Sequence, residues 1–376
     1  MTDRSSLSFG WARAWGALLF TSVAALPLAG CELITDAGEY AVYDGLCNRC
    51  PKSTHDLRHP PCPNQSEVQD TGETYTYAAR KLFFGKPEDW REGSSFSLGY
   101  DLDCSERPNG ARPVLCRERP GASDELPWEH LPRGIDNALA TRIFGPLYDT
   151  AAMFGQNIDL DATYSADQEE GRLGTLITIT GWNGTADDPA VVVSLHSSPG
   201  VSAENGPPRW DGTDTWDLYS DIPGNISRYF QIENMPGYVA NGMLVIDYRS
   251  RGDISYRFGS PQTSFRITVR EVSFIGYLDT ERLTNFNMVA VAPLVSIFDE
   301  VDEAAKVLSS CDPAGEAFLK EKLEQLLIFA VDMPTEPGRP VNDVCDGISF
   351  AWALDGQRAL VGGFKEESAL PDAGCL

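Results

Sequence analysis

The chain has 376 residues and a formal net charge of −25, with 30 basic and 55 acidic side chains. An acidic surface repels phosphate backbones, and phosphate neutralisation supplies most of the affinity of nucleic-acid-binding proteins. The charge therefore excludes DNA or RNA as a partner. The length suffices for two domains, or for one large β domain with an extension.

The first thirty residues have the organisation of an export signal. Arg4 and Arg13 provide positive charge, and an apolar stretch runs from Trp15 to Leu28. This stretch is shorter than the roughly 20 apolar residues that span a bilayer. Small residues then lead to Cys31, which is the order expected at a signal-peptide cleavage site. We therefore expect residues 1–30 to be a signal peptide that takes no part in the fold.

The residues Leu28-Ala29-Gly30-Cys31 resemble the lipobox of bacterial lipoproteins. The resemblance implies that Cys31 carries the lipid, palmitate included, and becomes the first residue of the mature chain. It implies a lipid-anchored protein of the bacterial cell envelope. We expect the outer membrane, and the sequence leaves the face of that membrane open. Two other stretches, Gly134–Asn137 and Cys345–Ser349, are similar to patterns in uncharacterised predicted lipoproteins of Gram-negative bacteria, and they imply no activity.

The remaining cysteines predict disulfide bonds, because their number is even and the protein is expected to be exported. Five of them lie at or before Cys116 and three lie at or after Cys311, so each group is odd. If all pair, at least one disulfide must join the two ends of the chain. Closing so long a loop would stabilise the fold by roughly 4 to 5 kcal/mol. The candidates are Cys47, Cys50, Cys62, Cys104, Cys116, Cys311, Cys345 and Cys375.

Composition divides the mature chain into three parts. Residues 31–130 are rich in cysteine and proline, which predicts a loop-dominated module. Residues 131–298 alternate β-branched segments with Gly, Asn and Asp turns, which predicts a mainly β fold, an antiparallel β-sandwich of the jelly-roll type. Residues 299–376 begin with an amphipathic helical hairpin and end in a strand. We expect this last part to pack on the N-terminal module.

Individual elements can be placed within these parts. Asp312-Pro313 fits an N-cap followed by proline at the first helical position, so the second helix of the hairpin should begin there. Alternation or β-branched composition places strands at 75–84, 96–102, 175–180, 190–195, 243–248, 265–269 and 348–354.

One group of residues has ligand spacing for zinc. Thiolate and imidazole side chains bind tetrahedral Zn²⁺. The N-terminal module has five such side chains in one stretch of sixteen residues, 47–62. Exported thiols are usually oxidised, so disulfides with two exposed histidines are the interpretation that we favour. The group is Cys47, Cys50, His55, His59 and Cys62.

A second group lies in or near loops of the β region and could bind a ligand. Exposed aromatic rings can stack on sugar rings, while aspartates could hold sugar hydroxyls or Ca²⁺. The opposing interpretation is that the aromatics pack internally and that the aspartates form turns. The residues are Trp182, Trp210, Trp216, Asp211, Asp214 and Asp217.

The sequence contains no Gly-x-Ser-x-Gly elbow, P-loop or dinucleotide fingerprint. We therefore expect a non-catalytic, membrane-anchored lipoprotein that binds a glycan or an envelope partner. The alternatives are a structural scaffold in an envelope complex and, less favoured, a hydrolase with an unrecognised carboxylate or metal site. We expect no cofactor, with Ca²⁺ or Zn²⁺ as the alternative.

Overall fold

The computed structural model describes residues 31–35, 63, 73–84, 116, 137–144, 160–172, 174–202, 206–219, 231–248, 253–260, 263–308, 313–336 and 343–365. In chain order, its elements are β1 (Cys31–Thr35), β2 (Thr74–Phe83), the π-helical turn η3 (Leu139–Phe144), α4 (Leu160–Glu169), β3 (Gly174–Thr180), β4 (Asp188–Ser198), β5 (Gly200–Val201), β6 (Thr215–Tyr219), β7 (Gln231–Ala240), β8 (Met243–Asp247), β9 (Ile254–Ser260), β10 (Thr263–Leu278), β11 (Arg282–Pro293), α5 (Leu294–Leu308), α6 (Pro313–Phe329) and β12 (Gly347–Lys365).

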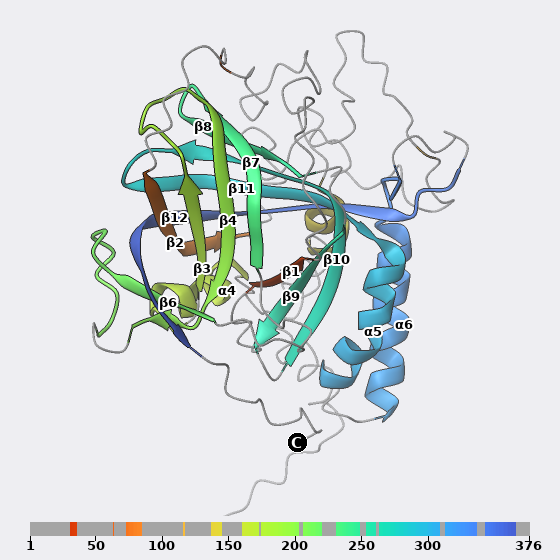
Figure 1. Ribbon diagram of the computed structural model, residues 1–376. Helices are drawn as coiled ribbons and strands as arrows, with labels where there is room; N and C mark the ends of the chain where they lie inside the picture. The colour runs from red at the N-terminus through yellow and green to blue at the C-terminus, as the bar shows by residue number, and fades with distance from the viewer. Residues whose placement is uncertain are drawn as a thin grey trace, which may run out of the picture.

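Eight of the strands close into an antiparallel β-barrel (Figure 1). Around the ring the order is β10–β8–β7–β4–β3–β2–β12–β11, and β11 pairs again with β10. The predicted β-sandwich is therefore wrong. Alternation along a strand shows only that one of its faces is buried, and a closed barrel satisfies that pattern as well as two stacked sheets do.

The barrel takes strands from outside residues 131–298. β2 belongs to the stretch predicted as a loop-dominated module, and it pairs with β12 through Tyr77↔Arg358 and Thr76↔Ala359. The strands expected at 75–84, 175–180, 190–195, 243–248, 265–269 and 348–354 are confirmed as parts of β2, β3, β4, β8, β10 and β12, except that Phe84 and Tyr248 lie one residue beyond β2 and β8. The strand expected at 96–102 lies outside the described residues.

Two further strands extend the sheet beyond one edge of β10. β9 pairs with β10 from Ile254↔Val269 to Ser260↔Thr263. β1 pairs in turn with β9, from Cys31↔Phe258 to Thr35↔Ile254, and it meets β7 at Ile34↔Gln231. The residues that follow Cys31 are therefore part of the sheet.

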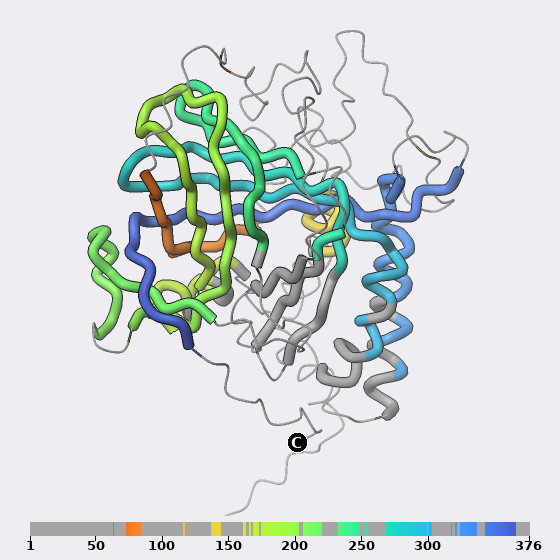
Figure 2. The backbone as a smooth tube through the Cα atoms, viewed as in Figure 1, coloured from red at the N-terminus to blue at the C-terminus, as the bar shows by residue number. Residues whose placement is uncertain are grey.

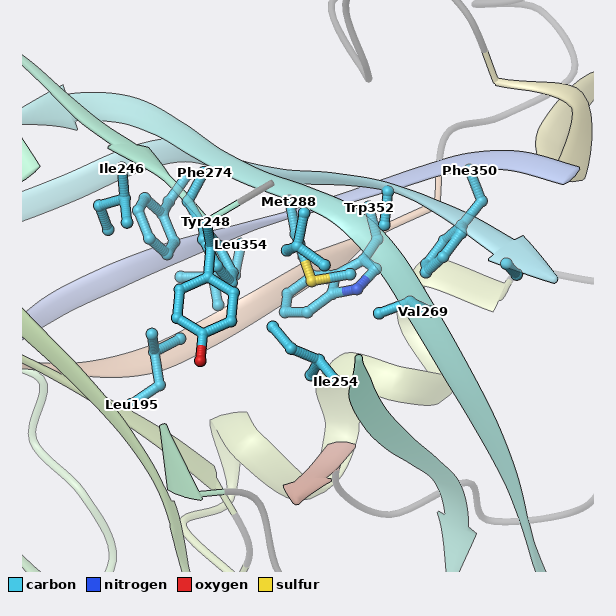
Figure 3. Close-up of a cluster of buried hydrophobic side chains, with 14 of the residues drawn as sticks. Leu195, Ile246, Tyr248, Ile254, Val269, Phe274, Met288, Phe350, Trp352 and Leu354 are labelled. Atoms are coloured by element: carbon cyan, nitrogen blue, oxygen red, sulfur yellow. The ribbon is translucent and has the colours of Figure 1, made fainter. Parts of the chain in front are cut away.

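Side chains fill the interior of the barrel. Alternate residues of neighbouring strands point inward, and those labelled in Figure 3 lie together between the strands. Phe274 and Phe286, on β10 and β11, stack with their ring centroids 5.5 Å apart. Trp352 is 1% exposed, and Leu195 and Leu354 are fully buried. Burying each such side chain contributes about 1.5–3 kcal/mol, so the interior is the main source of stability.

The predicted helical hairpin is confirmed as α5 and α6, which lie side by side next to β10 (Figures 1 and 2). α6 begins at Pro313, as the sequence predicts. Val301 and Leu327 are buried and belong to the main core. Lys320 Nζ lies 2.5 Å from Asp302 Oδ1 and joins the two helices at their exposed side.

A disulfide joins Cys116 to Cys345, with the two Sγ atoms 2.03 Å apart and a sequence separation of 229. The expectation that at least one disulfide links the early cysteines to the late ones is therefore confirmed. Cys116 is 6% exposed and Cys345 is fully buried. The other candidates, Cys47, Cys50, Cys62, Cys104, Cys311 and Cys375, lie outside the described residues.

The first residues of β12 have β11 on one side but lie beyond the reach of β2, whose pairing stops at Ala353↔Phe83. Side chains replace the missing strand. Asn137 Oδ1 accepts a hydrogen bond from Ala351 N at 3.2 Å, and Asp332 Oδ1 accepts one from Ser349 N at 2.8 Å. Buried backbone donors are therefore satisfied at this edge without a further strand.

Replacing Asn137 with alanine should destabilise the barrel. Asn137 is 3% exposed, and its Oδ1 also accepts from Ala140 N at 3.2 Å, so the variant leaves two buried donors unpaired. We expect Asn137→Ala to lower the free energy of unfolding by about 1–3 kcal/mol, measured by urea titration with the disulfide intact. Gln325→Ala, an exposed change on α6, should stay within about 0.5 kcal/mol of the wild type. Equal stability of the two variants would contradict this role of Asn137.

Candidate functional site

The structure brings together most of the predicted ligand residues but leaves one apart. Trp210, Trp216 and the three aspartates lie in residues 206–219, which cover the outer face of the barrel beside β2, β3 and β12. Trp182 follows β3 and belongs to the main core instead. It is 1% exposed, its Nε1–H donates to Thr185 O at 2.9 Å, and its ring packs edge-on against Tyr75. This indole is therefore part of the core.

The other two indoles are engaged within the chain. Trp216 is fully buried in a small outer core with Ala78, Leu176 and Ala359. Trp210 is half-buried, and its ring centroid lies 5.3 Å from that of Trp216. The Arg80 guanidinium lies over the Trp210 ring, 5.6 Å from its centroid. Trp182 and Trp216 are thus buried, and Trp210 alone of the three keeps part of its indole exposed, with Arg80 beside it.

Two of the aspartates organise backbone. Asp214 is 2% exposed, and its two oxygens accept hydrogen bonds from Arg209 N at 3.0 Å and Trp210 N at 2.6 Å. These bonds hold Trp210 at a φ of 57°, in the left-handed region. Asp211 is exposed and accepts from the hydroxyl and N–H of Thr213. The Thr213 hydroxyl bond is the main reason that the pKa of Asp211 is lowered.

Asp217 connects three segments at the centre of a small outer sheet formed by β5, β6 and the end of β12. Its Oδ1 accepts from Ser202 Oγ at 2.5 Å and from Gly363 N at 3.0 Å, and Lys365 Nζ lies 3.5 Å from its Oδ2. A Cβ on Gly362 would lie 2.5 Å from Asp217 Oδ1. A side chain at position 362 would therefore displace the Asp217 carboxylate that holds the end of β12 against β6.

The described residues contain no arrangement of side chains that would bind a metal ion. Among them, no group of three or more His, Cys, Asp or Glu side chains is arranged to hold an ion. The zinc candidates Cys47, Cys50, His55, His59 and Cys62 lie outside the described residues.

The point where β12 leaves the barrel is marked by Arg358. Its guanidinium carbon lies 4.4 Å from the centre of the Tyr75 ring, and its Nη2 donates to Thr74 O at 3.4 Å. Tyr77, two residues after Tyr75 in β2, is fully buried and donates its hydroxyl to Asp279 O at 2.6 Å. Burial raises the pKa of Tyr77 well above its ordinary value, and the nearby Arg358 charge acts in the opposite direction.

Beyond Arg358 the strand exposes apolar side chains. Leu360, Val361 and Phe364 are 50%, 47% and 72% exposed. We call these three residues the β12 end patch. They pair with β6 through Leu360↔Thr215, Val361↔Trp216 and Phe364↔Leu218, and Figure 2 shows the two segments side by side at the lower left. Leu360 and Val361 are consecutive in the strand and therefore expose apolar side chains on opposite faces of β12. Exposed apolar residues on an ordered strand are typical of a protein-contact surface.

Sequence reasoning missed the β12 end patch. The expected strand at 348–354 ends before it, and the residues after it, Leu360-Val361-Gly362-Gly363-Phe364, have no regular alternation. The sequence did contain a local sign of an unusual segment, because Leu360, Val361 and Phe364 flank the pair Gly362-Gly363. Their exposure depends on which side β6 occupies, and β6 comes from a distant part of the chain.

Comparisons with known proteins give no family: no family model, no curated protein and no solved structure matches this chain. Among the described residues, no helix is both long enough and apolar enough to cross a membrane.

The aspartates of this loop should differ in their effect on stability. Asp214→Ala leaves two backbone donors of the loop unpaired, and bonds to a charged acceptor contribute about 1.5–3 kcal/mol each. We expect a loss of about 2–4 kcal/mol in the free energy of unfolding, with faster hydrogen exchange over residues 206–219. Asp211→Ala, a change at the surface of the same loop, should leave the unfolding free energy close to the wild-type value. A stable Asp214→Ala variant with unchanged exchange would refute the structural role of this carboxylate.

Proposed function

We propose that this chain is an exported, lipid-anchored envelope protein without catalytic activity, and that it holds an envelope protein through the β12 end patch. The observation that carries the proposal is the exposure of Leu360, Val361 and Phe364 on a strand that Asp217 and Gly362 fix in place. Fixed apolar residues lose little conformational entropy when a partner covers them, which favours binding.

Export and anchoring are supported by the lipobox-like residues Leu28-Ala29-Gly30-Cys31. More than one acyl chain on Cys31 would give stable attachment, since a single chain holds a protein on a bilayer only reversibly. Cys31 is also the first residue of β1. The lipid would therefore be joined directly to a strand of the sheet.

A protein partner suits the surface better than a glycan does. Trp182 and Trp216 are buried and Trp210 is half-buried with Arg80 beside its ring, whereas glycan binding relies on exposed rings. The interior of the barrel is filled by its own side chains. Other large apolar side chains are exposed among the described residues, at Val192, Tyr277, Val295, Phe329 and Val344, but only the β12 end patch has three of them within five positions of one strand.

Lipidation can be tested at Cys31. In wild-type cells we expect a mature chain that begins at Cys31, carries acyl mass on that residue and incorporates labelled palmitate. Cys31→Ser should incorporate no palmitate and keep residues 1–30, because the attachment atom is absent. Thr35→Ser, a conservative change in the same strand, should behave as the wild type. Intact-protein mass spectrometry reads both results, and palmitate that persists in Cys31→Ser would refute the anchor.

The contact surface can be tested by photo-crosslinking in living cells. We expect p-benzoylphenylalanine in place of Phe364 to form a discrete adduct with one envelope protein, identified by mass spectrometry. The same residue in place of Val295 is the matched control, because Val295 is 66% exposed on α5, across the barrel from β6 (Figure 1). Adducts that are the same from both positions, or none from Phe364, would contradict the proposal.

A further inference from the structure

The end of β12 has a strand on one side only, among the described strands. Pairing with β11 ends at Gln357↔Arg282, and pairing with β2 ends at Ala359↔Thr76. From Leu360 onward, β6 is the neighbour. Residues 360–365 therefore form a strand edge that the barrel leaves open.

The direction of the backbone groups follows from one hydrogen bond. Leu360 N donates to Asp214 O at 2.9 Å, on the side of β6. Backbone groups alternate between the two edges of an extended strand. The N–H and C=O of Val361 therefore point away from β6, toward the open edge.

We propose that this edge binds an extended segment of the partner as an added β-strand. In this mode of recognition, main-chain hydrogen bonds supply affinity and side-chain contacts supply selectivity. The main-chain groups would be those of Val361, and the side-chain contacts would be with Leu360, Val361 and Phe364. The inference rests on the proposed function, because it states how a partner binds the same patch.

The edge is preorganised for such pairing. Gly362 packs directly against the side chains of Asp217 and Ser202, and Gly363 N donates to Asp217 Oδ1. Exposed edges are often protected by a lysine, but here Lys365 is directed to Asp217, 3.5 Å from its carboxylate. On binding, the partner segment would lose conformational entropy, but β12 would lose little because its backbone is already ordered.

Charge selects the class of segment. The chain carries a formal charge of −25, so two copies repel each other, which disfavours pairing of their own edges. A segment from another protein with Lys or Arg on either side of an apolar centre would be attracted instead. We therefore assign the edge to an extended apolar segment with basic flanks, and not to self-association.

The probe is a random twelve-residue peptide library displayed on phage, selected against the full-length mature protein in lipid nanodiscs, with empty nanodiscs as the subtraction. We expect enriched peptides to alternate apolar residues between basic ends. Their affinity, measured by fluorescence anisotropy, should fall as salt is raised, because surface attraction is screened. Phe364→Ser should weaken binding about tenfold or more, and Val295→Ser should leave it unchanged.

N-methylation of the selected peptide separates strand pairing from side-chain contact. Two versions are made, methylated at alternate amides and offset by one residue. Because backbone groups in a strand alternate with a period of two, one version should lose binding about tenfold or more and the other should keep it. Equal affinity of the two versions would overturn the strand-addition mode. This readout requires no change to the protein, so misfolding cannot produce it.

The outcomes also separate this inference from the proposed function. A specific crosslink from Phe364 with no dependence on the methylation phase would leave the function standing and overturn the mode. No crosslink and no selected peptide would overturn both.

Discussion

The pairing of β2 with β12 is the constraint on which the rest of the structure depends. It joins an early segment, Thr74–Phe83, to the last described strand, and it closes the ring that β10 and β11 complete on the other side. Without it both strands would present open edges, which invite wrong pairing. The Cys116–Cys345 disulfide joins early and late segments in the same way. Contacts so distant in sequence form slowly, so the barrel depends on its two ends meeting.

β12 is longer than the stretch over which β2 and β11 both pair with it, and its two ends therefore have other partners. The early end, near Ser349 and Ala351, is completed by the side chains of Asp332 and Asn137. The late end is completed on one side by β6. Every buried backbone donor needs a partner. Along β12, neighbouring strands provide most of these partners, and side chains provide them near Ser349 and Ala351. The open edge at Val361 is therefore a consequence of how the barrel closes.

Part of this could be predicted from sequence, where the signal is local. Alternation at Ile177 and Ile179 gives a strand, and Pro313 gives a helix start, because both depend on near neighbours. The odd counts of cysteines predicted a disulfide between the chain ends, although not the pair Cys116–Cys345. β7 was missed because Pro236 and Gly237 interrupt its pattern. Gly237 is required there, since a Cβ would lie 2.7 Å from Val245 O on β8.

The closed ring and the site could not be predicted, because they depend on distant segments. Whether the strands form a barrel or a sandwich is decided by the first and last strands meeting, and no local pattern records that. From the sequence, Trp210 is a candidate ring for stacking on a sugar. The Arg80 guanidinium that lies over this ring comes from β2, a distant part of the chain. The carboxylate of Asp214 is bound to backbone, although the sequence equally allows a ligand role.

The acidic surface and the apolar patch are consistent with each other. An open edge beside Leu360, Val361 and Phe364 would promote aggregation in a neutral protein. A net charge of −25 keeps copies apart over the screening length of the solvent. The same charge draws a cationic segment toward the edge, so one property both protects the surface and selects what binds it. Because residues 360–365 lie beyond the strands that close the ring, this contact surface can change without opening the barrel.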